Sequence, residues 1–251
     1  MFDAHCHLDM MDDHAAVLGR ARAAGVQDLL VSGVNPEGWR EQLLLLGGGV
    51  HIALGLHPWH VSNANDAWYE QLSELVETSP VSAIGETGLD FGARMDPEGF
   101  EAQASAFENH IGLAKHHRLP LVLHVVSAHQ RTLEILSRTG PLVSGGMVHA
   151  FSGSAEQALQ YVRLGLHISI CGTITDPRRR KLRRAVAEIP ADRLLVETDS
   201  PDQTPLNRRP GPNEPAFLID VVAAVSEARG EDPQLVANQT TLNAKTLFQI
   251  Q

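Results

Sequence analysis

Short apolar runs alternate with longer amphipathic segments along almost the whole chain. The apolar runs have the length and composition of buried strands, and we expect strands over residues 2–8, 28–34, 51–56, 82–86, 121–126, 146–151, 167–173 and 194–199. The segments between them have helical character, and we expect helices over residues 12–24, 37–46, 66–78, 98–117, 127–139, 155–164, 178–188 and 214–229. One further helix is expected over residues 233–248.

Glycine and proline residues fall where these elements should start or stop, as at Gly25, Pro36, Pro80 and Pro120. Eight strands that alternate with eight helices predict a parallel sheet of the α/β class. Eight near-equal units favour closure into a (β/α)8 barrel of TIM type with an extra C-terminal helix. An open, doubly wound sheet is the alternative. No linker or low-complexity segment divides the chain, so we expect a single domain over residues 1–251.

The composition is that of an ordinary globular protein, with 43% hydrophobic and 20% charged residues. Two cysteines, Cys6 and Cys171, argue against a disulfide scaffold and suit a reducing compartment. The first expected strand begins directly after Met1, which leaves no room for a signal peptide, and no apolar run is long enough to span a membrane. We therefore expect a cytoplasmic protein, with no membrane association and no protein partner implied.

The formal net charge of −10 disfavours broad electrostatic attraction to nucleic acid. It leaves a nucleic-acid substrate open, because bound metal ions and a local basic cluster can reverse the sign of the charge at one site.

Histidine and carboxylate residues recur at the ends of the expected strands, where the chemistry of parallel barrels gathers. His5 and His7 lie two residues apart on the first strand, so both side chains point to the same face while Cys6 points away and is expected to pack. The complete set lies on the first, fourth, fifth, sixth and eighth strands and comprises His5, His7, Glu86, His124, His149 and Asp199.

Each of these six residues taken alone has an ordinary structural explanation, such as a hydrogen bond or a helix cap. Taken together they favour a metal centre, because burying so many ionisable groups without a cation is costly. Six ligands exceed what one tetrahedral ion requires. We expect two divalent ions: His5, His7 and Asp199 on one, His124 and His149 on the other, and Glu86 as the bridge. Zinc, magnesium and manganese all remain open.

Two further carboxylates are expected behind the metal ligands. Asp3 lies two residues before His5, and Glu197 lies two residues before Asp199, so alternation places each on the same face as its ligand. We expect Asp3 and Glu197 to orient the ligand imidazoles. The alternative is that a shift of register along the strand places them elsewhere.

The chain resembles the TatD family of metal-dependent hydrolases, within the wider group of amidohydrolase-like barrels. The motifs that carry the resemblance are Asp3-Ala-His-Cys-His-Leu-Asp9, Gly55-Leu-His-Pro58, Ile84-Gly-Glu-Thr-Gly-Leu-Asp90, Leu119-Pro-Leu-Val-Leu-His124, Val148-His-Ala-Phe-Ser-Gly153 and Glu197-Thr-Asp-Ser-Pro201. The resemblance implies a TIM-like barrel with one or two divalent ions on the same six residues. It also implies a hydrolase, since several members are described as deoxyribonucleases.

We therefore expect a metal-dependent hydrolase, a phosphodiesterase or deoxyribonuclease in which the ions activate water. Asp199 is the expected general base and Glu86 the other catalytic residue. DNA or another phosphodiester is the expected substrate. The alternatives are hydrolysis of an amide, a lactone or an ester such as an aminoacyl-tRNA linkage, and a non-catalytic metal-binding protein.

Substrate contacts are expected from His57, which follows the third strand, and from Arg178 and Arg179 in a basic run. A structural hydrogen bond for His57 and a solvated face for the arginines are the alternatives. Members of the family frequently carry an arginine two residues after the histidine of the fifth strand, where this chain has Val126. A cation that would grip a phosphate is therefore missing at that position.

Overall fold

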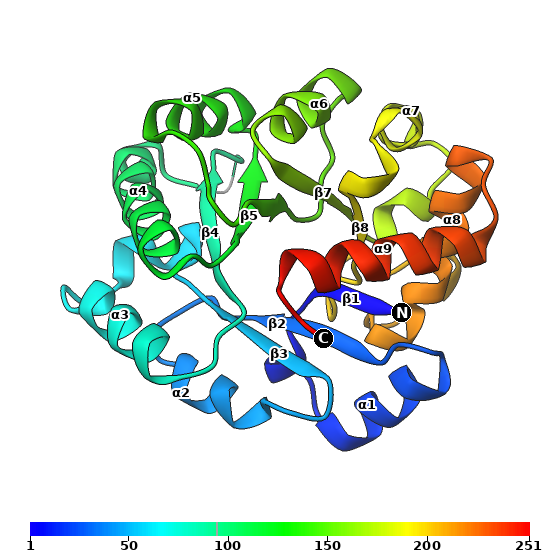
Figure 1. Cartoon of the computed structure of the whole chain (residues 1–251), viewed down its shortest axis with the longest axis horizontal. Coiled ribbons are helices and arrows are strands. Elements are labelled where there is room, and N and C mark those ends of the chain that lie inside the picture. Colours follow the sequence, from blue (N-terminus) through cyan, green and yellow to red (C-terminus); the bar gives the residue numbers. More distant parts are fainter. Residues whose placement is uncertain (94) are drawn as a thin grey trace.

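Eight parallel strands pair in chain order in a computed structural model that describes residues 1–93 and 95–251. Each strand lies beside the next strand of the sequence (Figure 1). The strands are β1 (Phe2–Cys6), β2 (Asp28–Ser32), β3 (Val50–Leu54), β4 (Ala83–Asp90), β5 (Leu121–Val126), β6 (Gly146–Val148), β7 (Leu166–Ile170) and β8 (Leu194–Val196).

Backbone hydrogen bonds close the ring between the first and the last strand. The amide of Asp199 donates to the carbonyl of His5 at 2.9 Å, and the amide of His7 donates to the carbonyl of Ser200 at 2.8 Å. The predicted (β/α)8 barrel is confirmed, and the doubly wound alternative is wrong. The assignment of residues 1–251 to a single domain stays a prediction.

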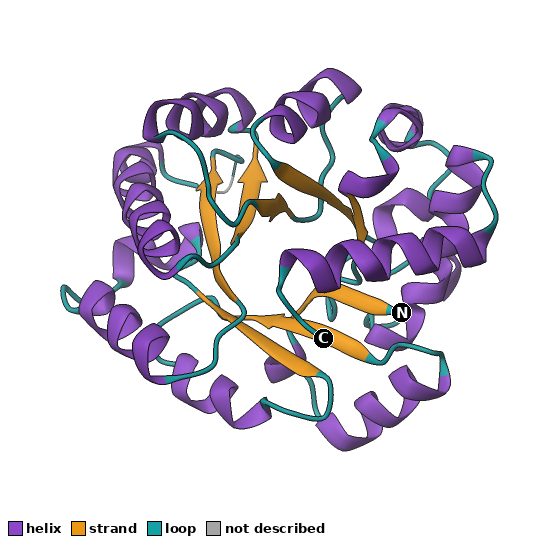
Figure 2. Cartoon of the chain, in the orientation of Figure 1, coloured by secondary structure: helices purple, strands orange, loops and turns teal. Residues whose placement is uncertain are grey.

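All of the described helices except α9 lie in an outer ring around the strands (Figure 2). The ring contains α1 (His14–Ala23), α2 (Trp39–Gln42), α3 (Trp68–Thr78), α4 (Phe100–His117), α5 (His129–Thr139), α6 (Ala155–Arg163), α7 (Arg180–Glu188) and α8 (Leu218–Arg229), and α9 (Pro233–Leu247) lies outside it. The helix expected over residues 37–46 is shorter than predicted and continues as a 3-10 turn over Leu43–Leu45. No described helix is both long and apolar enough to cross a bilayer.

The extra helix α9 covers the end of the barrel at which the strands begin (Figure 1). Its residues Ala244 and Leu247, together with Phe248, pack against the inward-facing residues of the strands. Phe2 stacks on Phe248 with the ring centroids 5.8 Å apart. Because this end is filled with apolar side chains, the opposite end, where the strands finish, is the one left for polar chemistry.

Two strands carry a β-bulge around a residue expected to bind metal, His5 on β1 and Glu86 on β4. Between Asp3 and Cys6, β1 advances three residues while β2 advances from Leu29 to Val31. Between Ile84 and Thr87, β4 likewise advances three residues while β5 advances two. Each bulge reverses which residues of its strand face the barrel interior.

The consequence of the bulges is visible in the packing. Phe2 and Ala4 pack inside the barrel, whereas Cys6 and Leu8 pack in the outer apolar core between strands and helices. The bulge in β1 therefore lets apolar side chains fill the bottom of the barrel while His5 and His7 still turn toward its mouth.

Candidate metal centre

The six side chains expected to bind metal converge at the end of the barrel where the strands finish, and Glu86 stands at their centre. Its Oε2 lies 3.3 Å from Nε2 of His5 and 3.6 Å from Nε2 of His7. Its Oε1 lies 2.7 Å from Nε2 of His149 and 2.8 Å from Nδ1 of His124. The two oxygens of one carboxylate thus face two separate pairs of imidazoles.

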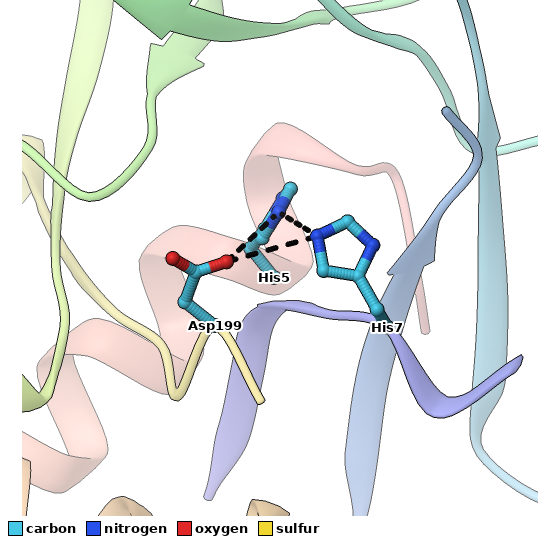
Figure 3. A group of neighbouring side chains, drawn as sticks. All are labelled: His5, His7 and Asp199. Atoms are coloured by element: carbon cyan, nitrogen blue, oxygen red, sulfur yellow. Dashed lines mark hydrogen bonds and ion pairs between the residues drawn. The ribbon is translucent and has the colours of Figure 1, made fainter. Parts of the chain in front are cut away.

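Asp199 completes the group on the side of His5 and His7 (Figure 3). Its Oδ1 lies 3.5 Å from Nε2 of His5 and 3.7 Å from Nε2 of His7, and the two imidazole nitrogens are 3.2 Å apart. The backbone of Asp199 has a φ of 58°, a left-handed conformation that non-glycine residues seldom adopt. This turn after β8 directs the carboxylate toward the imidazoles of β1.

Three of the four imidazoles are held from behind by a hydrogen bond to the nitrogen that faces away from Glu86. Ser32 lies behind two of them: its backbone oxygen is 3.1 Å from Nδ1 of His7, and the Ser32 hydroxyl is 3.0 Å from Nδ1 of His5. Oδ2 of Asp90 lies 3.2 Å from Nε2 of His124. A proton on each rear nitrogen leaves the front nitrogen with a free lone pair, which is the form that binds a metal.

Glu197 points into the barrel behind His149, as alternation along β8 predicts. Its Oε1 lies 3.6 Å from Nδ1 of His149 and accepts a hydrogen bond of 2.5 Å from the amide of Ala150. The Nδ1 atom of His149 and the Oε2 atom of Glu197 have no hydrogen-bond partner among the described residues.

The carboxylate of Asp3, expected to orient a ligand imidazole, contacts Thr198 in the structure. This carboxylate accepts hydrogen bonds from the amide of Thr198 at 2.8 Å and from the hydroxyl of Thr198 at 2.5 Å. The bulge in β1 falls between Asp3 and Cys6 and includes His5, so strict alternation no longer applies from Asp3 to the histidines. Ser32 occupies the position behind the imidazole of His5 instead. Asp3 fixes the backbone next to Asp199.

The centre is built to hold positive charge. Burial alone would raise the pKa of the Glu86 carboxyl, but the surrounding imidazoles of His149, His57 and His5 outweigh burial and hold that pKa well below its usual range. Burial lowers the pKa of His5 to about 4, so this imidazole is neutral at pH 7. For His149, burial is outweighed by Glu86 and Glu197, which raise the pKa well above its usual value. A proton on His149 therefore neutralises carboxylates that a cation would otherwise neutralise.

The structure adds three groups to the centre. His57, expected to contact substrate, lies 3.3 Å from Oε1 of Glu86 through its Nε2. Asp90 was not identified from the sequence, because β4 was expected to end at Glu86 and instead runs on to Asp90. Positions 86 and 90 share a face by strand alternation, which is the signal that would have found it. Trp59, in the 3-10 turn η3 (Pro58–Asn63), donates its indole N–H to Oδ2 of Asp90 at 2.6 Å.

The two cysteines take no part in the centre. Cys6 and Cys171 are free and buried, and burial raises the pKa of the Cys171 thiol to about 12 and that of Cys6 well above its usual value. Both thiols are therefore protonated and unreactive at neutral pH.

A cleft opens from the centre in two directions. One part, of about 1090 Å³, runs past Trp59 and is bordered by residues 201–204 and 209–212 of the long loop after β8. The other part, of about 430 Å³, runs along residues 178–182 at the start of α7. Val126, with 39% of its surface exposed, borders both parts, so no cation occupies this position.

The two arginines expected to bind substrate differ in their surroundings. Arg178 pairs with Asp176, with Nη2 and Oδ2 2.9 Å apart, and its side chain is largely exposed. Arg179 precedes the first residue of α7, which begins two residues later than predicted. Both arginines border the smaller part of the cleft, but Arg178 is engaged by Asp176. Of the two, Arg179 is better placed to meet a substrate anion.

The fold and the sequence motifs are matched by known proteins over the whole chain. The family model of TatD-related DNases matches residues 2–249. The "3'-5' ssDNA/RNA exonuclease TatD" of Klebsiella pneumoniae is 37% identical over 260 residues, which cover 100% of this chain and 98% of that protein. The "uncharacterized metal-dependent hydrolase YjjV" of Escherichia coli is 39% identical, over 99% of this chain and 97% of that protein.

Solved structures agree with these sequence matches. The crystal structure of YjjV, a TatD homologue from Escherichia coli, superposes with a TM-score of 0.94 at 36% identity and covers 100% of this chain and 98% of that one. A hydrolase of the TatD family from Entamoeba histolytica superposes with a TM-score of 0.80 over 98% of this chain and 97% of that one. Its identity of 20% shows the shared fold alone.

Proposed function

The chain belongs to the family of TatD-related DNases, and on that premise we propose that it hydrolyses phosphodiester bonds of single-stranded nucleic acid at a centre of two divalent ions. The metal-dependent hydrolase expected from the sequence is confirmed by the family and by the named relatives. The observation that carries the two-ion proposal is the position of Glu86, with Oε1 toward His124 and His149 and Oε2 toward His5 and His7.

We assign His5, His7 and Asp199 to one ion, His124 and His149 to the other, and Glu86 to both. The donor chemistry supports a metal centre, because the groups are buried and close together and the imidazoles around Glu86 hold its carboxylate ionised. When bound, such a pair of ions activates water and neutralises charge on the phosphoryl oxygens. Imidazole ligands favour zinc, and phosphate substrates favour magnesium or manganese, so all three ions are candidates.

The proposed role of Asp199 is to accept the proton of the attacking water. Its carboxylate borders both parts of the cleft, so it lies where it can take up a proton from a water at the metal centre. Asp90 holds the imidazole of His124 in position from behind, and we propose that the Glu197 carboxylate, 3.6 Å from Nδ1 of His149, supports that imidazole by its charge. Arg179 is proposed to contact a phosphate of the substrate, and His57 to contact the group that is being hydrolysed.

The test is hydrolysis of single-stranded DNA by the purified protein with magnesium, manganese or zinc, compared with a Glu86→Gln variant. This change keeps the shape of the side chain but removes the charge that faces both pairs of imidazoles. We expect hydrolysis to fall by at least about 100-fold, in line with the loss of a metal-bound catalytic group.

The matched control is Glu227→Gln, which makes the same chemical change on α8 at a largely exposed residue paired with Arg183. We expect it to retain wild-type activity. Nuclease activity that survives Glu86→Gln would point to a contaminating enzyme. If the wild-type protein hydrolyses simple esters or amides but no nucleic acid, its substrate contains an ester or amide bond in place of a phosphodiester. If it binds metal but hydrolyses none of these substrates, it is a metal-binding protein without catalytic activity.

A further inference from the structure

The two parts of the cleft differ in chemistry and meet at the candidate metal centre. We name the larger part the tryptophan lobe; it is bordered by Met10, Val34, Trp59, Pro210 and Pro212. We name the smaller part the arginine lobe; it is bordered by Ser152, Arg178, Arg179, Arg180 and Lys181. His124, His149 and Asp199 border both lobes. A ligand that crosses the metal centre therefore has an apolar surface on one side and cations on the other.

Trp59 is held in one orientation although 53% of its surface is exposed. The indole N–H is tied to Asp90 at 2.6 Å. The ring lies edge-on to the imidazole of His57 at 4.9 Å between centroids and 6.2 Å from that of His124. These contacts fix the indole, and its exposure leaves ring surface open beside the metal centre.

The other two tryptophans show what a structural tryptophan looks like in this protein. Trp39 is buried, and its indole N–H donates to the carbonyl of Gly55 at 3.0 Å. Trp68 stacks on the buried imidazole of His110 with 5.1 Å between the ring centroids. Both rings are used in packing. The ring of Trp59 is held at its edges, and a large part of it faces solvent, which is the arrangement expected for binding a flat ligand.

Charge decides which part of a nucleic acid each lobe suits. Asp90 and Asp202 border the tryptophan lobe against one described cation, Arg209. Among the described residues that border the arginine lobe, Asp199 is the one carboxylate, against three arginines and a lysine. Successive phosphates of a strand are therefore favoured along the arginine lobe and disfavoured in the tryptophan lobe.

We propose that Trp59 stacks on the base of the terminal nucleotide while the rest of a single-stranded nucleic acid runs along the arginine lobe. This proposal rests on the proposed nuclease function. The scissile phosphate then lies at the metal centre between the two lobes. A terminal nucleotide brings one base and no further phosphate into the tryptophan lobe, which matches its apolar and acidic border. Stacking on an aromatic face tolerates any base, so this site selects for an unpaired end rather than for a sequence.

The test compares two oligothymidylates, one with an ordinary nucleotide at the 3′ end and one with an abasic nucleotide there. The relative from Klebsiella pneumoniae is named for action from this end. We expect Trp59→Ala to lower kcat/KM on the ordinary substrate by about 5- to 150-fold, the range for loss of one base stack. For the wild-type protein, we expect kcat/KM to be lower by a similar factor on the abasic substrate than on the ordinary one. For Trp59→Ala, we expect kcat/KM to be nearly the same on the two substrates. Trp59→Phe keeps an aromatic face and should recover most of the activity.

A control variant and a length series separate stacking from other effects. Leu44→Ala removes an exposed apolar side chain that borders neither lobe and should leave both substrates unaffected. Arg179→Gln should raise KM for a ten-nucleotide strand more than for a dinucleotide, because only the longer strand reaches along the arginine lobe.

Equal losses for Trp59→Ala on the ordinary and abasic substrates would overturn the stacking proposal, because they would mean that Trp59 acts through Asp90 and His124. In that case hydrolysis that depends on Glu86 would still support the nuclease function. If the wild-type protein cleaves neither strand, the nuclease function fails, and the stacking proposal fails with it.

Discussion

Replacing Asp90 by asparagine removes one negative charge from behind the imidazole of His124 and leaves the size of the side chain unchanged. The carboxylate of Asp90 accepts hydrogen bonds from the indole of Trp59 at 2.6 Å and from the amide of Gly92 at 2.8 Å, and lies 3.2 Å from Nε2 of His124. All three of these contacts require an acceptor, because the indole and the amide can only donate and His124 must keep its proton on Nε2 if Nδ1 is to bind an ion.

An asparagine side chain cannot satisfy all three contacts. If the asparagine oxygen faces Trp59 and His124, the asparagine amino group faces the backbone amide of Gly92, and two hydrogen-bond donors then face each other. With its oxygen toward Gly92, its amino group meets the indole and drives His124 to the other tautomer, which puts a proton on Nδ1. Loss of such a supporting carboxylate lowers metal affinity by 10- to 100-fold in comparable centres, or about 1.4–2.7 kcal/mol.

The assay is competition between the protein and a chelator for zinc or manganese, with the bound ions counted at saturation. We expect Asp90→Asn to bind one ion 10- to 100-fold more weakly and to keep the affinity of the ion assigned to His5, His7 and Asp199. The control is Asp176→Asn, which removes a carboxylate paired with Arg178 and touches no imidazole. Unchanged affinity for both ions in Asp90→Asn would refute the role given to Asp90, and an equal loss at both would refute the division of ligands.

Two further predictions address substrate binding and stability. Val126→Arg places a cation at a position of the cleft that has none and should lower KM for a single-stranded oligonucleotide by about 3- to 10-fold. The plot of log affinity against log salt concentration should become steeper by about 0.7. An unchanged slope would argue against a phosphate at this position. Burial lowers the pKa of His110 from 6.5 to about 4, and its Nε2 accepts a hydrogen bond from the amide of Leu56. Between pH 6.5 and pH 4 the unfolded chain therefore binds more protons than the folded protein, and the free energy of unfolding falls as the pH falls. In urea unfolding, the free energy lost between pH 7 and pH 5 should be about 2 kcal/mol smaller in His110→Gln than in the wild type, and equal losses would contradict the assigned pKa.

The sequence by itself determined the barrel and the set of ligand candidates. Alternation of apolar runs with amphipathic segments is a local property, and eight such units leave few ways to bury every strand on both faces. The ligand candidates were found because each lies where a strand ends, and the ends of parallel strands meet at one side of a barrel. His5, Glu86 and His149 therefore come together although they are far apart in the chain.

Only the tertiary structure decided what supports these residues. Ser32, for which the sequence predicts no role, lies behind the imidazole of His5, and Asp3 lies on Thr198. The bulge in β1 that separates Asp3 from the imidazoles depends on how β1 pairs with β2, so the pattern of β1 does not contain it. Asp90 entered the centre because β4 continues past Glu86 alongside β5. Trp59 is oriented by Asp90, across 31 residues of sequence. Contacts of this kind arise between strands and turns after the chain has folded, so a pattern read along one segment cannot contain them.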